Sequence, residues 1–107
     1  MTTVVLLDEP TSFLDVSHQL ELLDLLTESN REHGTTVVMV LHELNLAARY
    51  ADHLVVIEGG RIAAAGEPVD VLTAEIVGGA FGLDCVVAED PVSRSPMIVP
   101  IGRFHQA

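Results

Sequence analysis

Two carboxylates and an imidazole each follow an apolar run in this sequence. Residues 3–7, "TVVLL", lead into Asp8 and Glu9, and residues 35–41, "TTVVMVL", lead into His42. A carboxylate can hold Mg²⁺ or accept a proton from water, and an imidazole can stabilise charge that develops during phosphoryl transfer. A turn or helix-capping role explains an isolated Asp-Glu pair equally well. The elements that position the three side chains therefore decide the interpretation.

Apolar strands alternate with helical patterns in this part of the chain. Residues 3–7 and 35–41 lack polar alternation, which is typical of parallel strands covered on both faces. Between them, apolar residues at helical spacing predict a helix from about residue 16 to residue 32, which Asp15 can cap. Parallel strands joined by a helix cross over in a right-handed sense, so their carboxyl ends open on the same edge of a sheet. We therefore expect the two carboxylates and the imidazole at a common rim.

The rest of the chain predicts shorter elements. They are a helix over 44–50, strands over 54–57 and 61–65 around Gly59-Gly60, helices over 68–72 and 73–79, and short strands over 86–88 and 97–101. We predict an α/β fold with a mostly parallel sheet, flanking helices and a C-terminal β-hairpin, organised as a single domain over residues 1–107.

Composition narrows the classes of function. The 107 residues are 49% hydrophobic and carry a net charge of -11, which indicates a folding but acidic chain. Its only basic residues besides histidine are five scattered Arg, so we expect no nucleic-acid partner. The single cysteine, Cys85, is expected to be a buried, unreactive thiol. The chain has neither a signal-peptide pattern nor an apolar run long enough for a membrane span, which favours a cytoplasmic location.

The ordered set of strand, "DEPTSFLD", amphipathic helix, strand and His resembles the C-terminal part of an ATP-binding cassette (ABC) transporter ATPase. Asp8 and Glu9 match its Walker B motif, Ser12 to Asp15 match the D-loop, and His42 matches the switch histidine. The likeness continues through "LHELNLAARYADHLVVIEGGRIAAAGEPVDVLT" to "DPVSRSP". There the sequence is similar to the cassettes that power import of ferric siderophores, haem or vitamin B12.

The resemblance implies ATP and Mg²⁺ as cofactors and a role for each matched residue. Asp8 would hold Mg²⁺ through water, Glu9 would be the general base, and His42 would contact the γ-phosphate. Ser12 and Asp15 would lie at the nucleotide site shared with a second ATPase subunit. A plain helix cap is the alternative for Asp15. Pro10 is expected to keep itself and Glu9 out of helical geometry.

Several motifs of the family do not occur in this sequence. It contains no Lys and no G-x-x-x-x-G-K-[ST] loop, so it lacks the phosphate cradle of Walker A. The LSGGQ-type signature and the Q-loop glutamine do not occur either. We therefore expect a partial P-loop NTPase fold that is inactive in isolation. The alternative function is a non-catalytic interaction module that pairs with a partner protein. A phospho-receiver domain is excluded, because that class needs a Lys.

The resemblance also implies partners and a location. They are a membrane permease subunit and a second ATPase subunit, with the cassette peripheral on the inner face of the cell membrane. In the family, another strand lies between the strands that match 35–41 and 54–57. Without it, apolar faces and strand edges are exposed, so we expect a homo-oligomer or a domain-swapped association of the isolated chain. The histidines other than His42 show no metal-ligand spacing.

Overall fold

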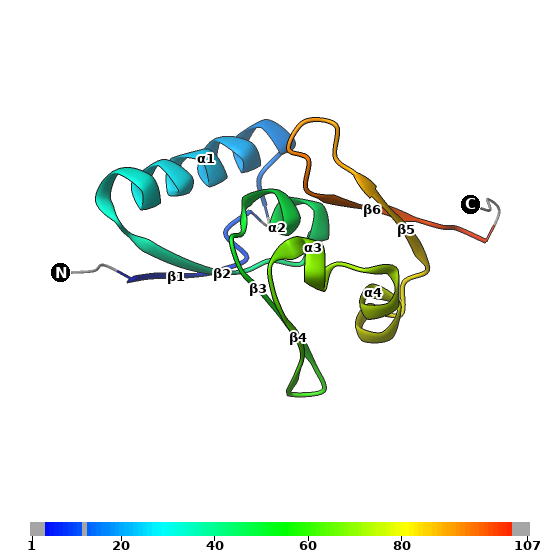
Figure 1. Ribbon diagram of the computed structural model, residues 1–107. Helices are drawn as coiled ribbons and strands as arrows, with labels where there is room; N and C mark the ends of the chain where they lie inside the picture. Colours follow the sequence, from blue (N-terminus) through cyan, green and yellow to red (C-terminus); the bar gives the residue numbers. More distant parts are fainter. Residues whose placement is uncertain (1–3, 12, 104–107) are drawn as a thin grey trace. The chain divides into compact units, whose positions relative to one another are not determined.

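A computed structural model describes residues 4–11 and 13–103 of this chain. The chain divides into two compact units, Met1–Glu43 and Leu44–Ala107, which we call the first and the second unit and describe separately. The prediction of one domain over residues 1–107 stays a prediction. Figure 1 gives the order of the elements along the chain.

The first unit is a β-α-β arrangement. Strand β1 (Val4–Asp8) pairs in parallel with β2 (Thr36–Val40), and helix α1 (Val16–His33) connects them (Figure 1). Leu6 lies opposite Val38 in the register, and Asp8 lies opposite Val40. The parallel pairing predicted from the two apolar runs is thus present, and Asp8 is the last residue of its strand.

Local signals in the sequence set the ends of α1. The Asp15 side chain accepts a hydrogen bond of 3.0 Å from the backbone N–H of His18, which is the N-cap interaction that the sequence predicts. At the other end, Gly34 takes a left-handed conformation with φ of 67°, and its N–H donates to Asn30. A residue with a side chain rarely adopts this φ, so glycine suits the position.

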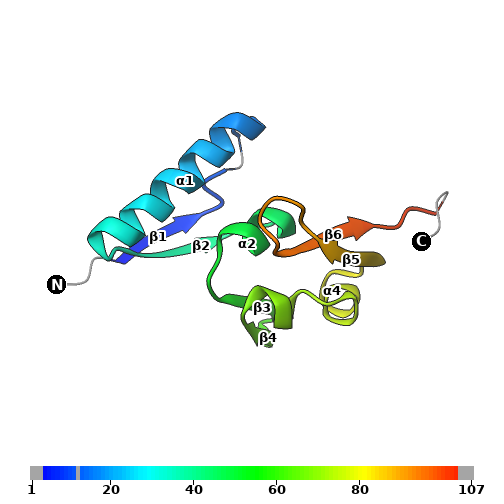
Figure 2. The ribbon, with the colours of Figure 1, turned by 45° about the horizontal axis from the view of Figure 1, so that its top comes forward.

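The two faces of the β1–β2 sheet differ in burial. Val37 and Met39 are half-buried. Helix α1 runs alongside the β1–β2 pair in Figure 2. On the opposite face, Leu6 is 74% exposed and Val38 and Val40 are 50% and 51% exposed. Such large exposed aliphatic side chains next to one another are unusual on a sheet. The exposed apolar face that the sequence predicts is therefore observed.

The second unit is built from two antiparallel hairpins and three short helices. It contains α2 (Leu44–Tyr50), β3 (Leu54–Glu58), β4 (Arg61–Gly66), α3 (Pro68–Val71), α4 (Ala74–Phe81), β5 (Cys85–Glu89) and β6 (Pro96–Pro100). The β3–β4 turn has positive φ at both Gly59 and Gly60, as a tight hairpin turn requires. The β5–β6 pair forms the expected C-terminal hairpin.

A small hydrophobic core holds the second unit together. It consists of buried side chains from two helices, the Leu72 that follows α3, and the C-terminal hairpin: Ala48, Leu72, Val77, Cys85 and Ile98. Burial of Cys85 confirms the expectation of a buried thiol. Helix α4 runs past Gly78-Gly79, where the sequence predicted its end, because the left-handed C-cap lies at Gly82 with φ of 63°.

The described strands form three two-stranded sheets. Only β1–β2 is parallel, so the parallel content is smaller than the mostly parallel sheet that the sequence predicted. The physical reason is that β3–β4 and β5–β6 are joined by turns, which impose antiparallel pairing, rather than by helical crossovers. Strands β2 and β3 belong to different sheets.

Candidate functional site

The carboxyl ends of β1 and β2 form the rim to which the sequence pointed. Asp8 is in register with Val40, and one residue further the Glu9 N–H donates a 2.8 Å hydrogen bond to the Val40 carbonyl. The backbone pairing of the two strands therefore continues through the Asp-Glu pair. This places both acidic residues beside the chain that leads to His42.

Glu9 and His42 are in direct contact at this rim. The backbone N–H of His42 donates to Oε1 of Glu9, and the Thr11 hydroxyl donates to Oε2 at 3.4 Å. The structure thus brings Asp8, Glu9 and His42 together, as predicted. The residue-42 group that makes the contact is the backbone amide, while the residue as a whole is exposed.

The backbone of Glu9 is unusual. Its φ is 46°, in the left-handed region that residues with a side chain rarely occupy. The following Pro10 favours an extended conformation at Glu9, so the left-handed φ is not what the sequence predicts for this position. Conformations of this kind cost about 1–3 kcal/mol and concentrate at functional sites. The strained backbone of Glu9 supports the view that function requires the Glu9 carboxylate at this position.

Hydrogen bonds of Thr11 and Gln19 hold the segment that follows the rim in place. Thr11 is only 3% exposed, and its carbonyl accepts from Nε2 of Gln19 at 3.2 Å and from the Leu14 N–H at 3.1 Å. The same Gln19 amide donates to the Leu14 carbonyl at 3.0 Å. Sequence reasoning missed both residues. The available signal was a Gln one helical turn after the cap, within reach of the loop that precedes the helix.

Asp15 serves α1 as its cap. Besides the His18 N–H, its Oδ1 accepts from the Ser17 hydroxyl at 3.0 Å and lies 2.8 Å from Nδ1 of His18. The hydrogen bond from the His18 backbone, followed by that from Ser17, holds the pKa of this carboxyl below its usual value. Ser12, the other predicted D-loop residue, lies outside the described residues.

The rim can be compared with the needs of Mg²⁺ and ATP. The exposed Asp8 carboxylate supplies a hard oxygen ligand, which suits Mg²⁺ when phosphate and water provide the remaining ligands. No three His, Cys, Asp or Glu side chains converge on a metal position in residues 4–11 and 13–103, so no all-protein cage occurs there. The residues present suit the phosphates of ATP less well. The sequence contains no Lys, so the lysine that contacts the phosphates in a Walker A loop does not occur in it.

None of the helices within the described ranges has the length and apolar character that crossing a membrane requires.

The fold and the rim define a class of protein. A solved metal-chelate type ABC transporter in an inward-facing conformation superposes with a TM-score of 0.82 and 29% sequence identity, over 95% of this chain and 42% of that chain. This match confirms a partial ABC ATPase fold.

Individual relatives confirm the resemblance to ATP-binding proteins of iron-siderophore importers. The chain is 51% identical to the ferric enterobactin transport ATP-binding protein FepC of Escherichia coli, and 53% identical to the achromobactin transport ATP-binding protein CbrD of Dickeya dadantii. Each match extends over 102 residues, 95% of this chain, but only 38% of the relative. No family model matches the chain.

Proposed function

We propose that this chain is the Walker B, D-loop and switch-histidine part of the ATP-binding subunit of an ABC importer, and that the whole subunit hydrolyses ATP to drive uptake of a ferric siderophore. The observation that carries the proposal is the rim, where the Glu9 carboxylate meets the backbone of His42 beside Asp8. The siderophore assignment is supported by the names of FepC and CbrD. Haem and cobalamin are the alternative substrates within the same group of importers.

Each rim residue receives one role in this proposal. Asp8 would hold Mg²⁺ through water, and the ion would supply positive charge against the phosphate oxygens. Glu9 accepts a proton from the attacking water at a carboxylate oxygen. The His42 imidazole donates to a γ-phosphate oxygen and stabilises the charge that grows there. Ser12 and Asp15 contact the nucleotide site of a second ATPase subunit.

The subunit is proposed to work with other proteins. A membrane permease and a second ATPase subunit are its partners, and the assembly places it on the cytoplasmic face of the cell membrane. The names of FepC and CbrD as transport ATP-binding proteins support this arrangement. The 107-residue chain alone is expected to bind Mg-ATP weakly and to hydrolyse it no faster than background, because it lacks the Lys-containing phosphate loop.

The general-base role can be tested in a complete cassette. We suggest joining this chain to the N-terminal part of FepC that it does not match, and comparing the product with its Glu9→Gln variant. Nucleotide binding should persist, while turnover should fall by about 10²- to 10⁴-fold, which is the usual contribution of a general base. Glu28→Gln, at an exposed position on α1, is the matched control and should keep full turnover. Unchanged turnover in Glu9→Gln would remove Glu9 from the mechanism.

The second candidate is the non-catalytic interaction module, which the lack of a phosphate cradle favours. Supplying the N-terminal part of FepC as a separate chain discriminates between the two. Recovered ATPase activity supports a catalytic part, whereas stable pairing without turnover supports the interaction module.

A further inference from the structure

The second unit contains a cavity of about 690 Å³ that is lined by its helices and its C-terminal hairpin. The apolar lining includes the buried Ala48 and Leu72. It also includes Val69 of α3, which is largely exposed, and the half-buried Val87 of β5. A cavity of this size with a mostly apolar lining is typical of sites for small molecules. All of the lining residues belong to the second unit.

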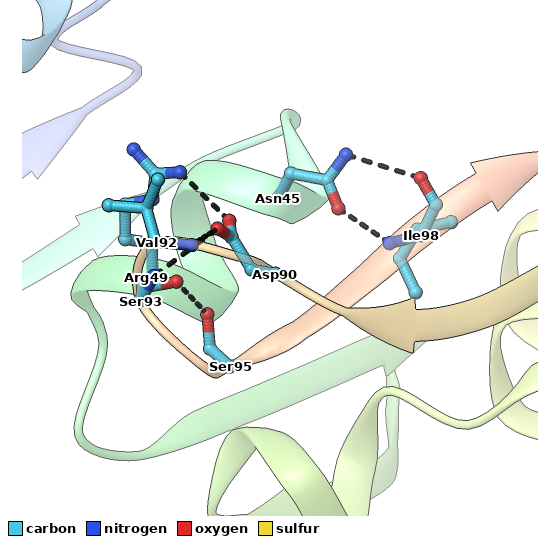
Figure 3. A network of polar contacts seen from close by, with 7 residues as sticks. All are labelled: Asn45, Arg49, Asp90, Val92, Ser93, Ser95 and Ile98. Atoms are coloured by element: carbon cyan, nitrogen blue, oxygen red, sulfur yellow. Dashed lines mark hydrogen bonds and ion pairs between the residues drawn. The ribbon is translucent and has the colours of Figure 1, made fainter.

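Two elements that line the cavity, α2 and the C-terminal hairpin, are joined by one side chain. Nδ2 of Asn45 donates to the Ile98 carbonyl at 3.2 Å, and the Ile98 N–H donates to Oδ1 of Asn45 at 2.6 Å (Figure 3). A side-chain amide that bonds to both backbone groups of one residue fixes its partner in position and in orientation.

An ion pair joins the same two elements a second time. Nη2 of Arg49 lies 2.8 Å from Oδ2 of Asp90, a residue that is only 5% exposed (Figure 3). The other carboxylate oxygen accepts from the N–H groups of Val92 at 2.8 Å and Ser93 at 3.2 Å. The Arg49 guanidinium, followed by the Val92 N–H, lowers the pKa of Asp90 to about 2. The carboxylate is therefore charged and held from several sides.

The turn of the hairpin is a preformed part of the cavity wall. The Arg94 N–H donates to the Asp90 carbonyl at 2.9 Å, and the Asp90 N–H donates to the Ser95 carbonyl at 2.8 Å. The hydroxyls of Ser93 and Ser95 lie 2.6 Å apart (Figure 3). Arg94 and Ser95 line the cavity. Because the turn is already ordered, a ligand that contacts it pays a smaller entropic cost on binding.

The charged part of the lining is mainly acidic. It includes Asp52, Glu67 and Glu89, but only one basic residue, Arg94. Nη1 of Arg94 lies 3.9 Å from Oε1 of Glu89, so this cation already faces a carboxylate. The exposed Asp52 and Glu67 carboxylates have no ion-pair or hydrogen-bond partner in the described part of the chain. The net negative charge attracts a cation to the cavity and repels an anion.

We propose that this cavity binds a small amphipathic cation. The apolar part of the ligand packs against Val69 and Val87, which removes their apolar surface from water and supplies affinity. Its cationic group lies near Asp52 and Glu67, whose charge selects a cation over an anion of the same shape. Binding here does not depend on the ATP hydrolysis proposed for the whole subunit.

The test titrates the 107-residue chain with octylammonium, octanoate and octanol, which have the same chain length but differ in charge. The NMR signals of backbone amides that line the cavity, such as those of Val87 and Ala88, report binding. We expect saturable shifts with octylammonium and an affinity for octanoate that is at least about tenfold lower. The inference is overturned if octanoate binds as tightly as octylammonium, or if the shifts are confined to amides outside the cavity.

Charge-removing variants test the two carboxylates. Asp52→Asn combined with Glu67→Gln should weaken octylammonium binding by about 3- to 20-fold, the range expected for two exposed charges, and leave octanol binding unchanged. Asp70→Asn is the matched control, because Asp70 is exposed on α3 but does not line the cavity. It should keep the wild-type affinity for octylammonium. Wild-type affinity in the double variant would overturn the inference.

Cavity-filling variants test the apolar part of the site. Ala88→Trp places a large side chain at an exposed lining position and should abolish binding of both octylammonium and octanol. Val69→Ser removes apolar lining at an exposed position of α3 and should weaken both, which keeps the test decisive if Ala88→Trp fails to fold. The inference is overturned if the folded variants bind octylammonium as tightly as the wild type.

Discussion

The two units of the chain differ in how they are stabilised. Among the described residues, Leu23 is the one buried apolar side chain of the first unit, whereas eight buried apolar residues lie in the second. The second unit also has the ion pair between Arg49 and the buried carboxylate of Asp90. The first unit instead exposes Leu6, Val38 and Val40 on one face of its sheet. The candidate site residues Asp8, Glu9 and His42 therefore lie in the unit that has fewer buried apolar side chains.

The candidate site and most of the hydrophobic core thus lie in different units. The rim depends on backbone pairing at the ends of β1 and β2 and on a strained Glu9. Apolar burial, which supplies most folding free energy, is found mainly in the second unit. Variants in each unit can test this division between a stabilising unit and a unit that carries the candidate site.

The largest effect is expected from truncating the core of the second unit. Leu72→Ala should lower the free energy of unfolding by about 2–5 kcal/mol, because it leaves a cavity at a fully buried position. Leu6→Ala in the first unit, on the exposed sheet face, should change it by no more than about 0.5 kcal/mol. Urea unfolding followed by the NMR amide signals of each unit measures both changes. Equal losses in the two variants would contradict the division.

A smaller loss of stability is expected when the ion pair between Arg49 and Asp90 is broken. In Asp90→Asn the Arg49 ion pair disappears, so the second unit should unfold at a lower urea concentration at neutral pH. The folded pKa of Asp90, about 2, lies below its unfolded value of 3.8. Its stabilising contribution is therefore fully present above the unfolded pKa and is lost as the pH falls through the folded pKa.

The measurement is the urea midpoint of the second unit at a series of pH values. The difference between wild type and Asp90→Asn should shrink as the pH is lowered from about 5 to about 2. Asp70→Asn, at an exposed position on α3, controls for the loss of one negative charge. A difference that stays constant over this range would show that the carboxylate charge is not responsible.

The exposed sheet face should affect association more than folding. We expect the wild-type chain to form a dimer or larger oligomer at micromolar concentration, because exposed aliphatic side chains on a sheet favour association. Leu6→Thr combined with Val38→Thr should shift light scattering towards the monomer and leave the unfolding of the second unit unchanged. Val92→Thr, at an exposed apolar position of the second unit, is the control. A wild-type chain that is already monomeric would contradict this expectation.

The smallest effect is expected at a turn of the second unit. Arg94 has φ of 66°, a conformation that glycine adopts without steric cost. Arg94→Gly should therefore raise the free energy of unfolding by up to about 1 kcal/mol, while the exposed Arg94–Glu89 pair at 3.9 Å contributes little. Arg94→Ala removes the same ion pair but keeps Cβ, so it should be less stable than Arg94→Gly. The reverse order in thermal or urea unfolding would refute the steric argument.

Features set by local sequence were predicted well. The Asp15 cap, the Gly59-Gly60 turn and the meeting of Asp8, Glu9 and His42 at one rim follow from capping, turn and crossover rules. These rules depend on neighbouring residues or on the order of strands. The structure therefore agrees with the sequence at these points.

Features set by distant residues could not be predicted in this way. Asn45 meets Ile98 across 53 positions, and Arg49 meets Asp90 across 41. Nothing in the residues around Asn45 indicates which backbone groups its amide will contact. The left-handed φ of Glu9 escaped prediction for a related reason, since contacts with Val40 and His42 accompany it against the preference set by Pro10. Tertiary contacts outweigh local preference at these positions.

The Asn45 amide has one more consequence, for the solubility of the chain. An exposed strand edge can recruit a strand from another molecule through its free N–H and C=O groups, which is how intermolecular β-sheets begin to grow. At Ile98 both groups are already bonded to Asn45, so an incoming strand finds neither donor nor acceptor at the middle of β6. One side chain thus protects the hairpin against edge-to-edge aggregation.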